Sequence, residues 1–181
     1  MKIISISKIA FVAASLAILG GVALAAQDRD SLKIPEGLAF SDFKGYDTWQ
    51  TVAVSATENS IKVIVANPAM IAAYKEGVPG NGKPFPEGSK VAKIEWVKQK
   101  NPVSPYFVEV PGALKTLAFI EKDSKRFPNT HGWAYAQWAN DPKSDTLAPN
   151  APLSASGHTC GYSCHSLVQK NDYIFTAYPK R

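Results

Sequence analysis

Short runs of apolar and β-branched residues, separated by turn-forming residues, recur along the chain and limit it to a fold rich in strands. The runs cover residues 49–54, 61–65, 89–96, 106–110, 116–121, 132–138 and 172–178. The first two are joined by a polar turn, which is typical of a hairpin. Because the strands outnumber the helices, we predict a largely antiparallel sheet with one or two helices, in the α+β class.

One helix and one long loop interrupt this pattern. Asn67 followed by Pro68 predicts a helix N-cap with proline in the first turn, and apolar residues then follow at helical spacing until Gly77. Four glycines and three prolines within residues 77–88 predict a loop.

The flanking segments are more polar than the strand-like runs. Residues 26–45 mix charge with proline and glycine, so we expect an extended lead-in outside the core and a fold that starts near Tyr46. Residues 139–159 are polar and are interpreted as a connection. Turns are expected at Pro111-Gly112 and at Pro128-Asn129.

Residues 1–25 have the three parts of a secretory signal peptide: a basic start, an apolar run over residues 9–22 and a small-residue cleavage site. The run is short for a membrane span, so we expect cleavage before Ala26, export to the periplasm and no membrane association afterwards. Residues 26–181 are then long enough for one domain. Loss of two lysines lowers the net charge from +5 to +3, which does not indicate a nucleic-acid partner.

Both cysteines of the chain, Cys160 and Cys164, precede His165 in one short segment. Two thiols beside a histidine favour covalent haem attachment, in which the thiols form thioether bonds and the imidazole binds the iron. The usual spacing has two residues between the cysteines, and here there are three. A disulfide between the cysteines is the main alternative. Zinc is another, and would need a fourth ligand such as His131, His158 or a carboxylate.

Several segments, taken in their order and spacing, resemble one family over most of the mature chain. They are the helix and loop 67–88, the strand 88–95, the run 122–127, the strand 132–136 and the cysteine segment before residues 173–176. The chain resembles the cytochrome P-460 and cytochrome c′-beta family of periplasmic haem proteins. The resemblance implies a curved antiparallel sheet with a few helices, a homodimer, and one haem c held by Cys160 and Cys164 with His165 as the proximal iron ligand.

Lys93 is a further candidate, because the resemblance matches it to the lysine that cytochrome P-460 bonds to a meso carbon of the porphyrin. Strand alternation places Lys93 on one face with Val91 and Glu95, opposite Lys90. A lysine pressed into a haem pocket would shift toward the neutral, nucleophilic amine. The alternative is that Lys93 only pairs with a haem propionate or with Glu95.

The sixth position of the iron is expected to be open. After signal removal Met70 is the sole methionine, and its place in a short helix indicates a core residue. His131 and His158 are not well placed as ligands, so we predict a five-coordinate haem. Candidate pocket walls are Phe107, Phe119, Trp133 and Tyr135. The resemblance also implies that residues 153–156 pass near the distal side, where they offer Ser154 and Ser156 but no carboxylate.

These features support several functions. The first is oxidation of hydroxylamine to nitric oxide or nitrous oxide, with transfer of electrons to an external acceptor. The second is non-catalytic binding or transport of nitric oxide, as in cytochrome c′-beta. A single-haem electron carrier and a haem-free domain with a disulfide are the remaining alternatives.

Overall fold

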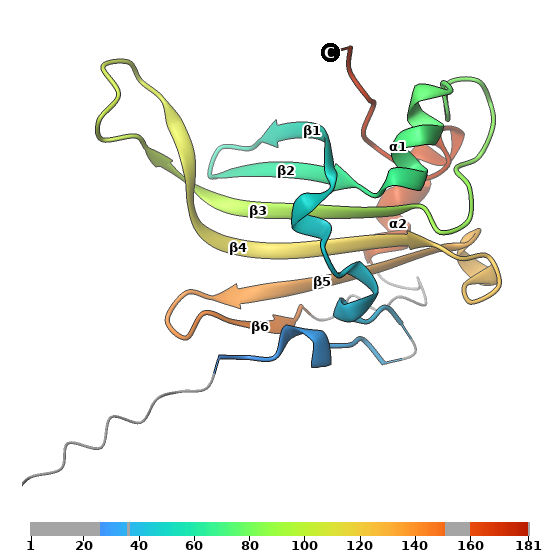
Figure 1. Cartoon of the computed structure of the whole chain (residues 1–181), viewed down its shortest axis with the longest axis horizontal. Helices are drawn as coiled ribbons and strands as arrows, with labels where there is room; N and C mark the ends of the chain where they lie inside the picture. The colour runs from blue at the N-terminus through green and yellow to red at the C-terminus, as the bar shows by residue number, and fades with distance from the viewer. Residues whose placement is uncertain (1–25, 36, 151–159, 181) are drawn as a thin grey trace, which may run out of the picture.

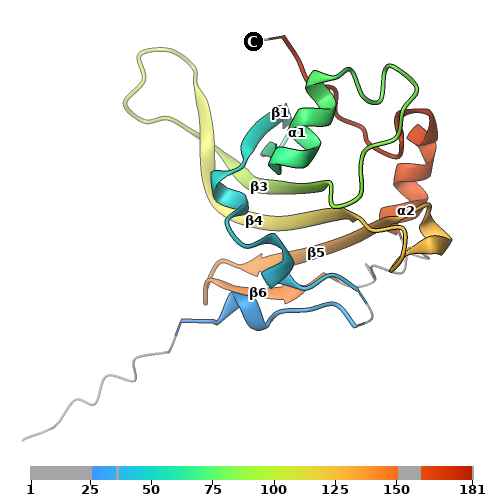
Figure 2. The ribbon, with the colours of Figure 1, turned by 45° about the vertical axis from the view of Figure 1, so that its right-hand side comes forward.

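The computed structural model describes residues 26–35, 37–150 and 160–180, and within them six strands form one open, curved sheet (Figures 1 and 2). The strands are β1 (Gln50–Ala56), β2 (Ser60–Ala66), β3 (Lys90–Lys100), β4 (Glu109–Lys122), β5 (Trp133–Asp141) and β6 (Thr146–Pro149). They lie in chain order, and all neighbouring pairs are antiparallel. One sheet with a few helices confirms the predicted α+β class. None of the helices in these ranges is long and apolar enough to span a bilayer.

The N-terminal segment covers one face of this sheet (Figure 1). It contains three 3-10 turns, η1 (Arg29–Ser31), η2 (Phe40–Phe43) and η3 (Tyr46–Thr48). Ile34, Leu38, Phe40 and Phe43 are buried there, and the ring of Phe43 stacks on Phe119 with 4.3 Å between centroids. The expectation of a lead-in outside the core is therefore wrong. Of the three turns, η2 directs Phe40 and Phe43 to the sheet, whereas η1 and η3 bury no residue.

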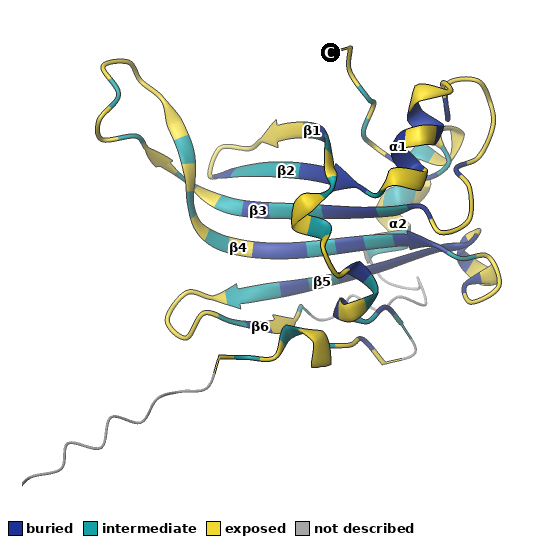
Figure 3. Cartoon of the chain, viewed as in Figure 1, coloured by how far each residue is buried: buried dark blue, intermediate teal, exposed yellow. Residues whose placement is uncertain are grey.

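Strand β4 continues through Pro111 and Gly112, where the sequence predicted a turn, so that prediction is wrong and two expected strands are one. Pro111 has no backbone N–H to donate to a neighbouring strand. It is tolerated here because the pairing of β4 with β3 is irregular next to its partner Lys98, and bulges accommodate proline. A Cβ on Gly112 would lie 3.0 Å from the carbonyl oxygen of Val97, so glycine serves a close backbone approach here. The hairpin beyond this point projects from the sheet and is largely exposed (Figure 3).

Helix α1 (Pro68–Lys75) confirms the predicted helix and its cap. The Asn67 side chain accepts a hydrogen bond from the Met70 amide at 3.2 Å. Met70 and Ile71 are buried in a second cluster on the other face of the sheet, so α1 closes one end of that face.

The C-terminal segment covers the rest of this second face, through α2 (Cys160–His165) and η5 (Ser166–Asn171). Residues 172–178 do not form the strand predicted from their composition. Asp172 and Tyr173 have φ angles of 49° and 64°, which lie in the left-handed region and are incompatible with an extended strand at the start of this segment. The segment packs on α1 instead, and the Tyr74 hydroxyl donates to the Thr176 carbonyl at 3.0 Å. Strand β6 occupies part of the region expected to be a polar connection.

Candidate functional site

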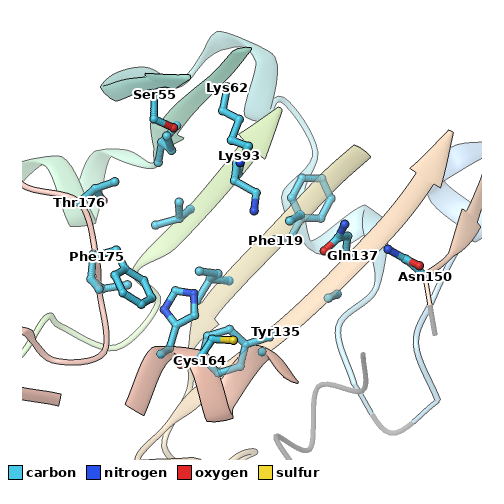
Figure 4. A pocket seen from close by; sticks show the side chains of 18 residues that line it. Ser55, Lys62, Lys93, Phe119, Tyr135, Gln137, Asn150, Cys164, Phe175 and Thr176 are labelled. Carbon is cyan, nitrogen blue, oxygen red and sulfur yellow. The ribbon is translucent and has the colours of Figure 1, made fainter. Parts of the chain in front are cut away.

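A cavity of about 480 Å³ lies between the second face of the sheet and the C-terminal segment. This volume is within the range of roughly 300–1,000 Å³ typical of ligand pockets. Lys62 and Lys93 enter it from β2 and β3, whereas Tyr135 and Cys164 lie across the cavity from them (Figure 4). The sheet therefore contributes cations at one side, and α2 contributes sulfur and imidazole at the other.

Strand alternation decides which lysine of β3 reaches the cavity. Lys93 and Val91 line it, as their shared parity predicted. Lys90 points to the opposite face, where its Nζ donates to the Asp42 carbonyl at 2.6 Å and pairs with Glu121 at 3.2 Å. The prediction that only one of these two lysines faces the pocket is confirmed.

Lys93 is half-buried, and no hydrogen bond or ion pair joins its ammonium to another residue in the part of the chain that the structure describes. Burial lowers the pKa of Lys93 from its usual value, and the neighbouring Lys62 ammonium lowers it further. Glu95, which the sequence offered as a partner, instead accepts from Lys115 at 3.1 Å and lies 3.9 Å from Lys62. The Lys93 amine is thus left facing the cavity.

Helix α2 presents Cys164 and His165 to the cavity. Cys164 is exposed and carries a free thiol. Cys160 begins the helix, one turn before Cys164. A thiol and an imidazole that border the same cavity are ligands of the kind that soft and borderline metals prefer.

The orientation of His165 is set by one hydrogen bond. Its Nδ1 lies 2.5 Å from the carbonyl oxygen of Tyr173. Because a carbonyl oxygen can only accept, Nδ1 carries the proton and Nε2 keeps its lone pair. Burial lowers the pKa of His165, the bond to Tyr173 opposes that effect, and the charge of Lys93 lowers it again. The neutral imidazole is the form that binds metals.

Comparison with known proteins decides the family. The family model described as cytochrome P460 matches residues 43–176, which is well over half of the chain. The chain belongs to the cytochrome P460 family. Membership confirms the resemblance seen in the sequence and implies a haem cofactor with iron. A comparison with curated proteins finds no match.

The lining of the cavity fits the haem of the cytochrome P460 family. An imidazole whose Nε2 keeps its lone pair and the thiol of Cys164 lie on one side, and two lysines that can meet propionate charges lie on another. Apolar walls between them suit a porphyrin ring. They are formed by Ile64, Val91, Ala118, Ile120, Ala136 and Ile174.

Gly161 allows α2 to approach the sheet closely enough for this arrangement. A Cβ at this position would lie 2.7 Å from the Tyr135 Cβ, which is closer than such atoms come in proteins. We therefore expect Gly161→Ala to lower the free energy of unfolding by about 1–3 kcal/mol through overpacking, as measured by chemical denaturation. Ser163→Ala, at an exposed position of the same helix, is the matched control. Equal stability of both variants would contradict the close approach.

The other residues proposed from the sequence fall into three groups. Tyr135 lines the cavity, as expected, and Phe119 borders it, although the Phe119 ring is buried against Phe43 in the cluster on the other face of the sheet. Trp133 is a buried core residue outside the cavity lining, and Met70 is also core, as predicted. Phe107 is 77% exposed at the projecting hairpin, so its assignment as a pocket wall is wrong.

The remaining histidines do not contribute to the described lining. His131 is in a turn, with its ring stacked 5.1 Å from that of Tyr173. His158 and residues 153–156 lie outside the described residues. Among the residues that the structure describes, no group of three or more His, Cys, Asp or Glu side chains is arranged to hold a metal ion.

Five polar lining residues were not proposed from the sequence: Ser55, Lys62, Gln137, Asn150 and Thr176. In the strand register, Lys62 of β2 lies opposite Glu95 of β3. Gln137 of β5 lies opposite Ala118 of β4, which in turn lies opposite Lys93. The hairpin register could have identified Lys62, whereas Gln137 requires knowledge of three adjacent strands. No sequence signal marks Asn150.

Proposed function

We propose that this member of the cytochrome P460 family is a periplasmic protein that binds one haem c and oxidises hydroxylamine to nitric oxide or nitrous oxide at a five-coordinate iron. The observation that supports this proposal is the placement of Lys93, whose side chain enters the cavity without a partner among the described residues. The family resemblance assigns to Lys93 the covalent bond to a porphyrin meso carbon. A half-buried amine with a lowered pKa suits that role.

The proposed attachment uses Cys160 and Cys164 for the thioether bonds and Nε2 of His165 for the iron. Positions 160 and 164 are one turn apart on α2, and helix residues four apart share a face. Three intervening residues are therefore compatible with two attachment points on one side of a helix. The bond from Nδ1 to Tyr173 holds the imidazole in the required tautomer.

When bound, the haem would supply an iron site that takes up electrons from a coordinated substrate. The protein residues would orient the small polar substrate and exclude bulk water. Gln137 lies in the same cross-strand row as Lys93, so its amide can hydrogen-bond a molecule held between them. The electrons would leave to an external acceptor, which is the proposed redox partner.

Replacement of Lys93 by methionine tests this function. The variant removes the amine while keeping an unbranched side chain of similar length. We therefore expect a changed absorption spectrum and a roughly 10–100-fold slower hydroxylamine-dependent reduction of an added acceptor, the size typical of groups that tune a metal site. In the unaltered protein, the tryptic peptide that contains Lys93 should be joined through the haem to the peptide that contains Cys160 and Cys164, and its mass should show both additions.

Lys98→Met is the matched control, because Lys98 is on the same strand and pairs with Glu109 at 2.7 Å outside the cavity. Its spectrum and activity are expected to equal those of the unaltered protein. An unchanged spectrum in Lys93→Met would remove the support for the cross-link and for catalysis of this kind.

The apolar walls of the cavity favour a second candidate function, reversible binding of nitric oxide. Such walls admit a small diatomic gas and disfavour water. This candidate needs no bond to Lys93. It predicts a nitric oxide complex in Lys93→Met as stable as in the unaltered protein, with no acceptor reduction by hydroxylamine in either.

We also propose that residues 1–25 are a cleaved signal peptide and that residues 26–181 form one haem domain. A second copy of the chain is the proposed protein partner. The projecting hairpin between β3 and β4 supports this, because Val103, Tyr106 and Phe107 are each more than three-quarters exposed and have apolar surface for such a contact.

A further inference from the structure

The turn that follows η5 has a backbone conformation that its residues rarely adopt. Asp172 and Tyr173 are consecutive, and both have positive φ angles, 49° and 64°. Left-handed backbone is uncommon for residues other than glycine and is especially unfavourable for bulky ones. Surrounding contacts must therefore hold these two residues in place.

Those contacts converge on the Asp172 carboxylate. Its Oδ2 accepts from the Lys122 ammonium at 2.6 Å and from the Phe85 amide at 2.7 Å. Its Oδ1 accepts from the Trp133 indole at 3.3 Å. The side chains of Lys122 and Asp172 are only 7% and 12% exposed. One carboxylate thus ties the turn to β4, to β5 and to the loop before β3.

The other side of the turn is held by aromatic stacking. The Tyr173 ring is buried and stacks on His131 at 5.1 Å and on Tyr162 of α2 at 5.8 Å. With the carboxylate fixed on one side and the ring on the other, the peptide group of Tyr173 has little freedom. Its carbonyl is the group that accepts from Nδ1 of His165.

We propose that Asp172, clamped by Lys122, is a positioning residue that presents the Tyr173 carbonyl to His165. This inference rests on the proposed function, in which Nε2 of His165 binds the iron. A hydrogen bond from Nδ1 to a carbonyl orients the imidazole and makes it a stronger donor. A stronger donor stabilises oxidised over reduced iron, so Asp172 sets the redox balance of the site from outside the ligand set.

The test is Asp172→Asn, which keeps the shape of the side chain and removes its charge. We expect the haem to remain attached, the iron–histidine stretching frequency of the reduced protein to fall, and the midpoint potential to rise. A change of about tenfold in the equilibrium between oxidised and reduced iron corresponds to about 59 mV for one electron. A side chain that only maintained the fold would move neither readout.

Glu87→Gln is the matched control. Glu87 borders the same surface depression as Asp172 but is exposed and bonds Ser124 rather than the turn. Its potential and stretching frequency should equal those of the unaltered protein. If Asp172→Asn carries haem and its midpoint potential and stretching frequency are unchanged, the inference is overturned and the proposed function stands. If the unaltered protein carries no haem, the proposed function itself is refuted.

A second variant covers the case in which Asp172→Asn alone does not fold, because it leaves the Lys122 ammonium buried without its partner. The double variant Asp172→Asn with Lys122→Gln replaces the ion pair by two neutral groups that can hydrogen-bond each other. We expect this protein to fold, to carry haem and to show the same directions of change. Values equal to those of the unaltered protein would again overturn the inference.

Discussion

Protein with His165→Gly is expected to keep its covalently bound haem and to lose the proximal ligand. The thioether bonds do not involve the imidazole, so the mass of the attached haem should be unchanged. Ligand binding and acceptor reduction should fall by more than the roughly 10–100-fold typical of residues outside the ligand set. Added imidazole can occupy the space that the side chain leaves, and we expect it to restore part of the spectrum and activity.

The matched control is Leu167→Gly, another truncation to glycine, two residues after His165. The Leu167 side chain is 81% exposed and does not line the cavity, so its loss should leave the haem site unchanged. We expect the control to keep the absorption spectrum of the unaltered protein. If His165→Gly also kept that spectrum, another residue would have to be the proximal ligand.

Loss of the Phe43 ring is expected to be the most destabilising of these changes to the fold. Phe43 is fully buried and stacks on Phe119 at 4.3 Å, so Phe43→Ala leaves a cavity under the sheet. We expect the free energy of unfolding to fall by about 3–5 kcal/mol, measured by chemical denaturation.

Leu167→Ala provides the comparison, because its side chain is 81% exposed and lies outside the projecting hairpin. Its effect should remain within about 0.5 kcal/mol, as for most surface changes. Equal effects of the two substitutions would show that the N-terminal segment does not belong to the core.

The sequence alone predicted the structure correctly wherever a local pattern of residues determines it. Alternation along β3 placed Lys93 and Lys90 on opposite faces, because a strand with one buried face has a side-chain period of two. Asn67 and Pro68 marked the start of α1 for an equally local reason, namely capping of free amides. The cysteine motif could be proposed as a haem site for a similar reason, since Cys160, Cys164 and His165 are close together in the chain.

Predictions failed where distant contacts override local preference. Phe43 is core only because Phe119, far along the chain, offers it a partner. The turn at Asp172 and Tyr173 depends on Lys122, fifty residues earlier, whereas the β-forming composition after it favoured a strand. Lys62 and Gln137 reach the cavity through strand pairing, which composition alone does not specify.

The intact mass of the mature protein, made in a host that can attach haem to cytochromes, tests the central claim most directly. We predict the mass of residues 26–181 plus one haem, retained after denaturation. A mass equal to that of the polypeptide alone would contradict haem attachment at Cys160 and Cys164, and with it the proposed function.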